Sequence, residues 1–258
     1  MVKKLMDADE FAHRELRRLA KAQQKLLPQQ APLMVGYEAS LMYRPAYVVT
    51  GDYYDFFPLR NNAWGVFIGD GSGHGPAACM VMAMMRAILR THPDIHREPG
   101  STLEVAGAML RELISSDMFM TGLYLRLEQG GYVSWAAAGH HPPIRMAPDG
   151  TIPPSDLDVG DVPLGLHTDS PICYETITWT LEPGERLLLF TDGLYEAQNR
   201  DNLKFGRGPL ECCMRESLGR ALPSLTECLL RRAEEHLAGT EFEDDFTVIG
   251  IERQAPEA

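Results

Sequence analysis

Apolar residues form two kinds of pattern along the chain. After Pro32 they mostly alternate with polar residues or form short runs, and both arrangements are typical of β-strands. Longer stretches, in which apolar residues recur every three or four positions, predict helices. The predicted strands cover residues 33–46, 51–59, 63–70, 119–128, 132–139, 172–181, 186–190 and 246–251, and the predicted helices cover 9–30, 75–92, a segment starting at 101, 208–217 and 224–237. Strands joined by tight turns, with helices inserted in pairs, favour an α+β domain of antiparallel layers over a doubly wound fold.

Local signals place several boundaries within this pattern. Residues 60–62 (Arg-Asn-Asn) separate two strands and predict a hairpin turn. Ser101 is followed three residues later by Glu104, which fits a capping box and predicts a helix that begins at Ser101. Tyr53 and Tyr54 point to opposite faces of their strand, so we expect one ring in the core and the other at the rim of a cleft.

The first 32 residues differ from the rest of the chain, because the segment from Asp9 to Gln30 is highly charged and free of glycine. Its apolar residues gather near one helical face, and Pro28 marks the end of the pattern. These apolar residues are Phe11, Leu16, Leu19, Leu26 and Leu27. We predict one amphipathic helix, with two interpretations open. It either packs on its own domain, or serves as a linker or coiled-coil arm that pairs two subunits or receives a signal.

Composition narrows the class of protein. Hydrophobic residues make up 45% of the 258 residues, which is enough for a substantial core. The formal net charge is −12 and basic residues do not cluster beyond the N-terminal helix, so we expect no nucleic-acid partner. No apolar run is long enough for a membrane span and the N-terminus is too charged for a secretory signal, so we expect no membrane contact and a cytoplasmic location. Five cysteines without a C-x-x-C pair predict neither disulfides nor a zinc site.

The stretch 66–78 (VFIGDGSGHGPAA) places Asp70 at the end of an apolar strand, among four glycines. It lacks the Gly-Lys-Ser/Thr of a P-loop, and the predicted hairpin before it argues against a dinucleotide-binding βαβ unit. The remaining interpretation is a carboxylate aimed at a metal ion, with glycines that let the backbone turn sharply.

Three further acidic positions lie at a junction between an apolar strand and a polar turn: Asp52, Asp192, and the pair Asp244 and Asp245. Carboxylates that share one cleft would repel each other by about 4 kcal/mol per pair, at about 4 Å and an effective dielectric constant of about 20. Divalent cations would remove that penalty, so the pattern predicts an oxygen-ligand site for Mg²⁺ or Mn²⁺.

Five motifs, taken together and in order, resemble the PPM-type metal-dependent serine/threonine phosphatases (protein phosphatase 2C-like), in their bacterial SpoIIE/RsbU-like branch. They are GDYYDF (51–56), GDGSGHGPAA (69–78), AAGHHPPI (137–144), LLLFTDGLYEAQN (187–199) and DDFT (244–247). The resemblance predicts a phosphatase domain over residues 33–252, preceded by a linker or switch helix at 1–32 and followed by a tail at 253–258. It implies an αββα sandwich, in which two antiparallel sheets are flanked by helix pairs.

The same resemblance implies a cofactor of two Mn²⁺ or Mg²⁺ ions. The ligands carried over from the family motifs are Asp52, Asp70, Asp192 and Asp244, with the carbonyl oxygen of Gly71, and Asp245 is expected to lie beside them. No covalent nucleophile is implied, because a water acidified by the two ions would attack the phosphorus of a phosphoserine or phosphothreonine.

Three further residues are candidates for a role in catalysis or substrate binding, and each also has a purely structural explanation. His74 is a candidate general acid, or else a loop residue at a helix start. Arg44 and His140 are candidate substrate-binding residues, or else a solvated arginine and a structural turn. Three positions depart from the usual family pattern, namely Thr50, Met120 and His141, and they leave the positioning of the substrate open.

The resemblance also implies partners. The expected substrate is a phosphorylated anti-sigma-factor antagonist in a partner-switching signalling pathway. Residues 23–28 (QQKLLP) resemble the helix end that joins such domains to a sensory or receiver module, so an upstream domain and a homodimer through the N-terminal helix are expected. Two other functions stay open: a catalytically idle partner-binding module, and a metal-dependent phosphohydrolase of small phosphate esters.

Overall fold

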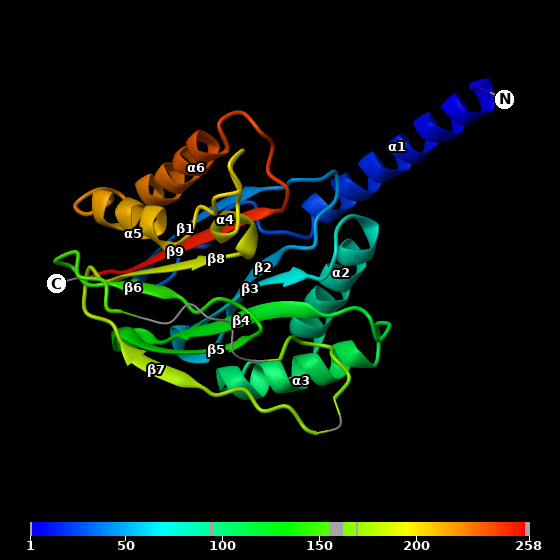
Figure 1. The fold of residues 1–258 in the computed structure, drawn as a ribbon. Coiled ribbons are helices and arrows are strands. Elements are labelled where there is room, and N and C mark those ends of the chain that lie inside the picture. Colours follow the sequence, from blue (N-terminus) through cyan, green and yellow to red (C-terminus); the bar gives the residue numbers. More distant parts are fainter. Residues whose placement is uncertain (1, 93–94, 155–161, 169, 256–258) are drawn as a thin grey trace.

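The computed structural model describes residues 2–92, 95–154, 162–168 and 170–255, and it contains two antiparallel sheets packed face to face (Figure 1). The four-stranded sheet has the order β1-β9-β8-β6, formed by Tyr37–Arg44, Phe246–Arg253, Arg186–Phe190 and Ile144–Met146. The five-stranded sheet has the order β2-β3-β4-β5-β7, formed by Tyr53–Pro58, Trp64–Gly71, Met120–Leu127, Tyr132–Ala138 and Ile177–Thr180.

Helix pairs cover the two outer faces of the sheets (Figure 1). The five-stranded sheet is covered by α2 (Pro76–Thr91) and α3 (Pro99–Arg111), and the four-stranded sheet by α5 (Arg207–Glu216) and α6 (Pro223–Leu237). A short helix, α4 (Asp192–Tyr195), follows β8, and the 3₁₀ turns η1 (Arg60–Asn62) and η2 (Gln129–Gly131) close two hairpins. The predicted αββα sandwich of antiparallel sheets is therefore confirmed, as is the hairpin turn at residues 60–62.

Alternate side chains of the four-stranded sheet face different layers. In β8, Leu187 and Leu189 belong to the core between the sheets, whereas Leu188 and Phe190 pack beneath the helices of the outer layer. Both faces of this strand are covered, which explains why the segment 186–190 is almost continuously apolar in sequence.

The N-terminal helix α1 (Val2–Gln24) projects from the body of the molecule (Figure 1). Near its C-terminal end, Leu16 and Ala20 pack against the core, and Leu27 just beyond the helix is buried. Phe11, farther out along the helix, is exposed, and so is Leu19, although it lies between Leu16 and Ala20 in the sequence. The end of the helix thus packs on the domain, while its earlier turns extend away from it. Among the described residues, every helix is too short or too polar to span a membrane.

The prediction for the tyrosine pair is wrong, because both Tyr53 and Tyr54 are buried. The Tyr54 ring lies 5.4 Å from that of Tyr43, on β1 of the facing sheet. The Tyr53 hydroxyl donates a hydrogen bond of 2.7 Å to Asp55, which is paired with Arg86 of α2. One face of β2 packs against the four-stranded sheet and the other against α2, so neither tyrosine lies at the rim of a cleft.

Two boundary predictions also need correction, and one strand was not predicted. Helix α3 begins at Pro99, not at Ser101, and no side chain caps it, because the proline starts the helix two residues earlier. The strand predicted at 172–181 is confined to Ile177–Thr180. Strand β6 lies inside a proline-rich stretch of low apolar content, and strand periodicity did not reveal it.

Candidate metal centre and active site

Both sheets contribute acidic residues to one end of the sandwich. Asp52 directly precedes β2, and Asp70 lies near the end of β3, opposite Thr121 of β4. From the other sheet, Asp192 opens α4 just after β8, and Asp244 lies two residues before β9. Since the sheets pack face to face, these strand ends meet although their residues lie far apart in sequence.

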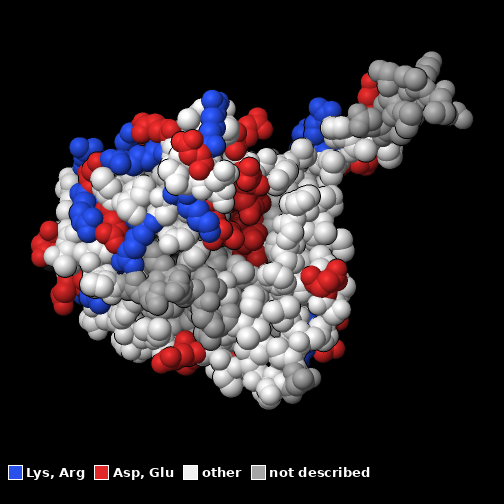
Figure 2. Space-filling model, viewed as in Figure 1, with Lys and Arg blue, Asp and Glu red and all other residues white. Residues whose placement is uncertain are grey.

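Asp70, Asp192 and Asp244 form a tight carboxylate cluster. One carboxylate oxygen of each residue lies within 4.8 Å of those of the other two. Burial, followed by the negative charge of neighbouring carboxylates, raises the pKa of Asp70 to about 8. Burial is also the main cause that raises the pKa of Asp244 to about 6 and the pKa of Asp192 above its usual value. Figure 2 shows acidic side chains gathered in a band across the middle of this face.

Asp52 lies deepest among the predicted ligands, with 1% of its surface exposed. Its Oδ2 atom accepts a hydrogen bond of 3.0 Å from the Thr191 hydroxyl and a second one from the Thr247 hydroxyl. Burial raises its pKa well above the usual range, and the charges of Asp70 and Asp245 add to this effect. The two threonines fix the orientation of a carboxylate that has almost no access to solvent.

Asp245 ties the loop before β2 to the start of β9. Its carboxylate accepts hydrogen bonds from the backbone N–H of Ala46 at 2.9 Å, from the N–H of Gly51 at 3.2 Å and from the Thr50 hydroxyl. The Thr50 oxygen in turn accepts a hydrogen bond of 3.0 Å from the N–H of Asp52. The hydroxyl of Thr50, one of the departures from the family pattern, thus links the Asp245 carboxylate to the backbone of Asp52.

Gln23, at the end of α1, contacts this same loop. Its side-chain amide donates to the Thr50 carbonyl at 2.6 Å and accepts from the Thr50 N–H at 3.1 Å. The glutamine is 3% exposed, which is unusual for a polar residue of a helix that projects into solvent. In the sequence, Gln23 is only the first residue of the linker motif 23–28, and nothing in that motif indicates this contact. Thr191 and Thr247 were missed as well, and their only signal was the presence of a threonine inside each acidic motif.

A cavity of about 290 Å³ opens beside the carboxylate cluster, lined partly by Asp192, Asp244, Glu196 and Glu243. His74 is exposed, and its imidazole slightly offsets the rise that burial causes in the pKa of Asp244, which places it near the cluster. Its ring stacks on that of Tyr47 with 5.2 Å between the ring centroids. The histidine is therefore close to the carboxylates and open to solvent.

His140 lies in a different setting. It is 5% exposed, and its Nδ1 atom lies 2.9 Å from the Thr121 hydroxyl. Burial lowers its pKa to about 3, so the ring is neutral near pH 7. This favours a structural role over contact with a substrate phosphate.

The other two departures from the family pattern also have clear surroundings. The ring of His141 packs between those of Phe190 and Tyr195, at centroid distances of 5.4 and 4.8 Å, and it partly offsets the rise that burial causes in the pKa of Asp192. Met120 is fully buried next to the strand that carries Asp70.

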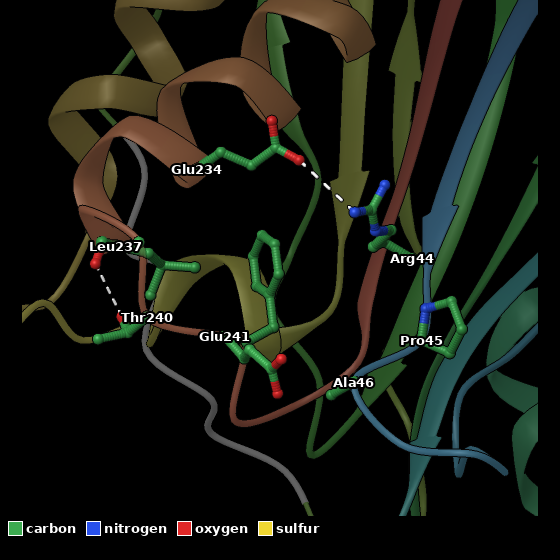
Figure 3. Close-up of a pocket in the computed structure, with 9 residues that line it drawn as sticks. Arg44, Pro45, Ala46, Glu234, Leu237, Thr240 and Glu241 are labelled. Atoms are coloured by element: carbon green, nitrogen blue, oxygen red, sulfur yellow. Dashed lines mark hydrogen bonds and ion pairs between the residues drawn. The ribbon is translucent and has the colours of Figure 1, made fainter.

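Arg44 lines a separate cavity of about 400 Å³ between the end of β1 and the loop after α6 (Figure 3). Its guanidinium lies 3.8 Å from the Glu234 carboxylate, and about half of each side chain is exposed. The cavity is also lined by Glu241, three residues before Asp244, so it adjoins the acidic face. Arg44 has an acidic partner of its own there, and the cavity that it lines contains none of the three clustered aspartates.

The donor set of this site fits a divalent cation. Carboxylates and backbone carbonyls are the ligands that Mg²⁺ and Mn²⁺ prefer. Burial, and after it the charges of neighbouring carboxylates, raises the pKa values of Asp52, Asp70 and Asp244, so their ionised forms are destabilised when no cation is near. A bound cation would reverse that balance.

The family model of stage II sporulation protein E (SpoIIE) matches residues 60–254, and the chain belongs to this family. Among curated proteins, the chain is similar to the phosphoserine phosphatase RsbU of Bacillus subtilis, with 25% identity over 246 residues that cover 93% of this chain and 70% of RsbU. The chain spans less than half the length of two longer curated relatives.

Solved structures show the same fold. The SiaA-PP2C domain of Pseudomonas aeruginosa superposes with a TM-score of 0.80 at 21% identity, over 95% of this chain and 98% of that domain. A structure of RsbU and RsbW domains from Mycobacterium tuberculosis gives a TM-score of 0.73 at 24% identity, over 89% of this chain and 64% of that one. The αββα sandwich of this chain is thus the fold of PP2C phosphatase domains.

Proposed function

We propose that this chain is a metal-dependent phosphatase that hydrolyses phosphoserine or phosphothreonine in a protein substrate. The observation that carries the proposal is the cluster of Asp70, Asp192 and Asp244, at the end of a PP2C-type sandwich and beside an open cavity. Membership of the SpoIIE family and similarity to a phosphoserine phosphatase support the same reaction.

The proposed metal ligands are Asp52, Asp70, Asp192 and Asp244, together with the carbonyl oxygen of Gly71. A pair of Mn²⁺ or Mg²⁺ ions, when bound there, would supply an acidified water as the nucleophile and positive charge for the substrate phosphate. The cluster and the cavity beside it are lined by carboxylates, which repel a phosphate, and this is why cations are central to the proposal.

The residues around the ligands would position them. Thr191 and Thr247 hold the Asp52 carboxylate in one orientation, and Asp245 holds the loop that carries Asp52. His74 is our candidate for the donor of a proton to the leaving serine oxygen, because it is exposed and close to Asp244.

For the substrate, we propose a phosphorylated anti-sigma-factor antagonist in a partner-switching pathway. The relative RsbU is named a phosphoserine phosphatase, and RsbU and RsbW domains occur together in one of the similar structures. The projecting helix α1 is the proposed connection to a sensory or receiver domain, and its exposed Phe11 and Leu19 are the proposed contacts of a homodimer.

The proposal is tested with a phosphoserine protein and with p-nitrophenyl phosphate, each in Mn²⁺ and in EDTA. We expect turnover of both substrates that EDTA abolishes and that Asp70→Ala and Asp192→Ala reduce by at least about 100-fold. Asp201→Ala, in an exposed loop, is the matched control and keeps full activity. Metal binding without turnover of either substrate would favour an idle partner-binding module, and turnover of the small ester alone would favour a small-molecule phosphohydrolase.

A further inference from the structure

Three cysteines gather between helices α5 and α6, on the outer side of the four-stranded sheet. Cys212 and Cys213 are neighbours on α5, Cys228 lies on α6, and all three are free thiols. The two helices pack against each other and are joined by residues 217–222. Since Cys213 and Cys228 are 15 residues apart in sequence, it is the packing of the helices that brings the thiols together.

One carboxylate joins two of these thiols. The Cys212 thiol donates a hydrogen bond to Oε1 of Glu216, and the Cys228 thiol donates one to Oε2, each at 3.5 Å. The hydrogen bond from Cys228 is the main cause that lowers the pKa of Glu216. Glu216 is therefore ionised near pH 7, and Cys228 faces α5 with its S–H bond directed at a group that can accept the proton.

Arg232, one turn further along α6, lies beside the same group. Burial lowers its pKa, but interactions with all three thiols outweigh that effect and raise it. Its buried Nε atom has no hydrogen-bond partner among the described residues. Arg231 also approaches, with its Nη2 atom 3.7 Å from the Cys228 sulfur. Both arginines are paired with glutamates, so it is the N–H donors close to the sulfur, and not an excess of charge, that would stabilise a thiolate at Cys228.

Cys213 provides a second sulfur within reach of Cys228. Its side chain is fully buried in the core beneath the two helices. Burial raises the pKa of the Cys213 thiol, and a hydrogen bond with the Cys228 thiol adds to the rise. Cys228 itself is only partly buried, so a reagent in solution can reach it. The pair thus combines one accessible thiol with one protected thiol.

A metal ion fits this group poorly. In the part of the chain that the structure describes, only Asp70, Asp192 and Asp244 bring three ligand atoms within 4.8 Å of one another. Cys212 is linked to Cys228 through the carboxylate of Glu216. The chemistry that remains is between two sulfur atoms, those of Cys213 and Cys228.

We propose that Cys213 and Cys228 are a redox-active pair, which forms a reversible disulfide between α5 and α6 on reaction with a small-molecule disulfide such as oxidised glutathione. The Cys228 thiol gives its proton to Glu216, and its sulfur attacks one sulfur of the reagent. The S–S bond of the reagent breaks, one glutathione thiolate leaves, and a mixed disulfide remains on Cys228. The Cys213 sulfur then attacks the Cys228 sulfur and releases the second glutathione thiolate. Two protein thiols are oxidised, one glutathione disulfide is reduced, and the two released thiolates take up the two protons.

The pair is separate from the carboxylate cluster and does not depend on the phosphatase reaction. Leu237, which lines the cavity beside the cluster, is nine residues beyond Cys228 on α6, a distance of about 13 Å. The disulfide would tie together the two helices that cover the four-stranded sheet. Helix α6 is already bonded to that sheet, because the Ser40 hydroxyl of β1 donates to the Thr226 hydroxyl at 3.1 Å. We therefore expect the oxidised protein to unfold at a higher temperature.

The experiment treats the full chain with oxidised glutathione in EDTA and maps its cysteines by mass spectrometry of non-reduced peptides. We expect one linked pair of peptides, with the bond assigned by fragmentation to Cys213 and Cys228. The melting temperature should rise on oxidation and return when dithiothreitol reduces the bond. A trivalent arsenical, which bridges two adjacent thiols, should protect the same two cysteines from alkylation in the reduced, unsubstituted chain.

Two serine variants separate the roles of the pair. Cys228→Ser should reduce the linked product at least about tenfold, because the attacking thiol is gone. Cys213→Ser should instead retain the mixed glutathione disulfide on Cys228, since no second thiol displaces it. Cys212→Ser and Cys173→Ser are the matched controls and should form the link as the unsubstituted chain does. The proposal is overturned if the bond joins Cys212 to Cys228, if the unsubstituted chain yields only mixed disulfides or free thiols, or if the arsenical protects neither cysteine.

Discussion

Replacing Asp70 by asparagine is expected to make the metal-free protein more stable, although it removes a proposed metal ligand. The side chain is nearly isosteric, but it takes one negative charge out of the carboxylate cluster. Since the folded-state pKa of Asp70 is raised from 3.8 to about 8, ionising this residue destabilises the folded state. The contribution of Asp70 to the stability of the metal-free protein is therefore most favourable below about pH 4, and it declines as the pH rises towards 8.

Two independent estimates give the size of the effect. A change of pKa from 3.8 to about 8 corresponds to about 6 kcal/mol between the protonated and ionised forms. Two charges at the 4.8 Å limit of the cluster repel by about 3.5 kcal/mol at an effective dielectric constant of about 20. The value of about 6 kcal/mol includes the cost of burying a charge. The asparagine amide is itself a buried polar group, so the substitution recovers only part of that cost. We therefore expect a gain of about 3 kcal/mol at pH 8 to 9, where the aspartate would be ionised.

The assay is urea unfolding of the wild-type chain and of Asp70→Asn, in EDTA and in Mn²⁺, at pH 6 and pH 9. In EDTA, the variant should be more stable than the wild type, by a larger margin at pH 9. In Mn²⁺, the order should reverse, because only the wild type gains free energy from binding the ion. Asp201→Asn, an exposed aspartate outside the cluster, should change stability by less than about 0.5 kcal/mol in every condition. A metal-free Asp70→Asn protein that is less stable than the wild type at pH 9 would refute the reasoning.

Three further substitutions probe the supports of the site. Gln23→Leu removes both hydrogen bonds to the backbone of Thr50, and we expect a loss of about 1 to 3 kcal/mol in urea unfolding and a weaker Mn²⁺ affinity in calorimetry. Gly51→Ala puts a Cβ 2.6 Å from the Gly71 carbonyl oxygen and 2.9 Å from an Asp70 carboxylate oxygen, so kcat should fall by at least about tenfold, and unchanged kinetics would contradict this packing. Asp55→Asn removes a fully buried charge from between two arginines of α2, which should lower the unfolding free energy by about 3 to 5 kcal/mol without changing the Mn²⁺ affinity.

The antiparallel α+β layers were predictable from local signals in the sequence, whereas the αββα sandwich was predicted from the family resemblance. Alternating and continuous apolar runs mark strands, and the order of strands and helix pairs restricts the fold to few topologies. The candidate metal-binding aspartates could also be predicted, since each lies where an apolar strand meets a polar turn. Errors occurred where a tertiary contact overrides a local preference. The segment 172–181 alternates like a strand, yet only Ile177–Thr180 pairs with β5, because the residues before them lie along α3.

The supports of the carboxylates could not be predicted, because each of them joins segments that are distant in sequence. Gln23 and Thr50 are 27 residues apart, and Thr50 and Asp245 are 195 apart. Neither a glutamine at the end of a charged helix nor a threonine before a strand carries a local signal of this role. The two contacts form one continuous path from the projecting helix to the loop that carries Asp52. A shift of α1 relative to the domain would break the paired hydrogen bonds of a buried amide, and such groups are costly to leave unpaired. We therefore expect a shift of the helix to disturb the loop that carries Asp52, whatever partner the exposed part of the helix contacts.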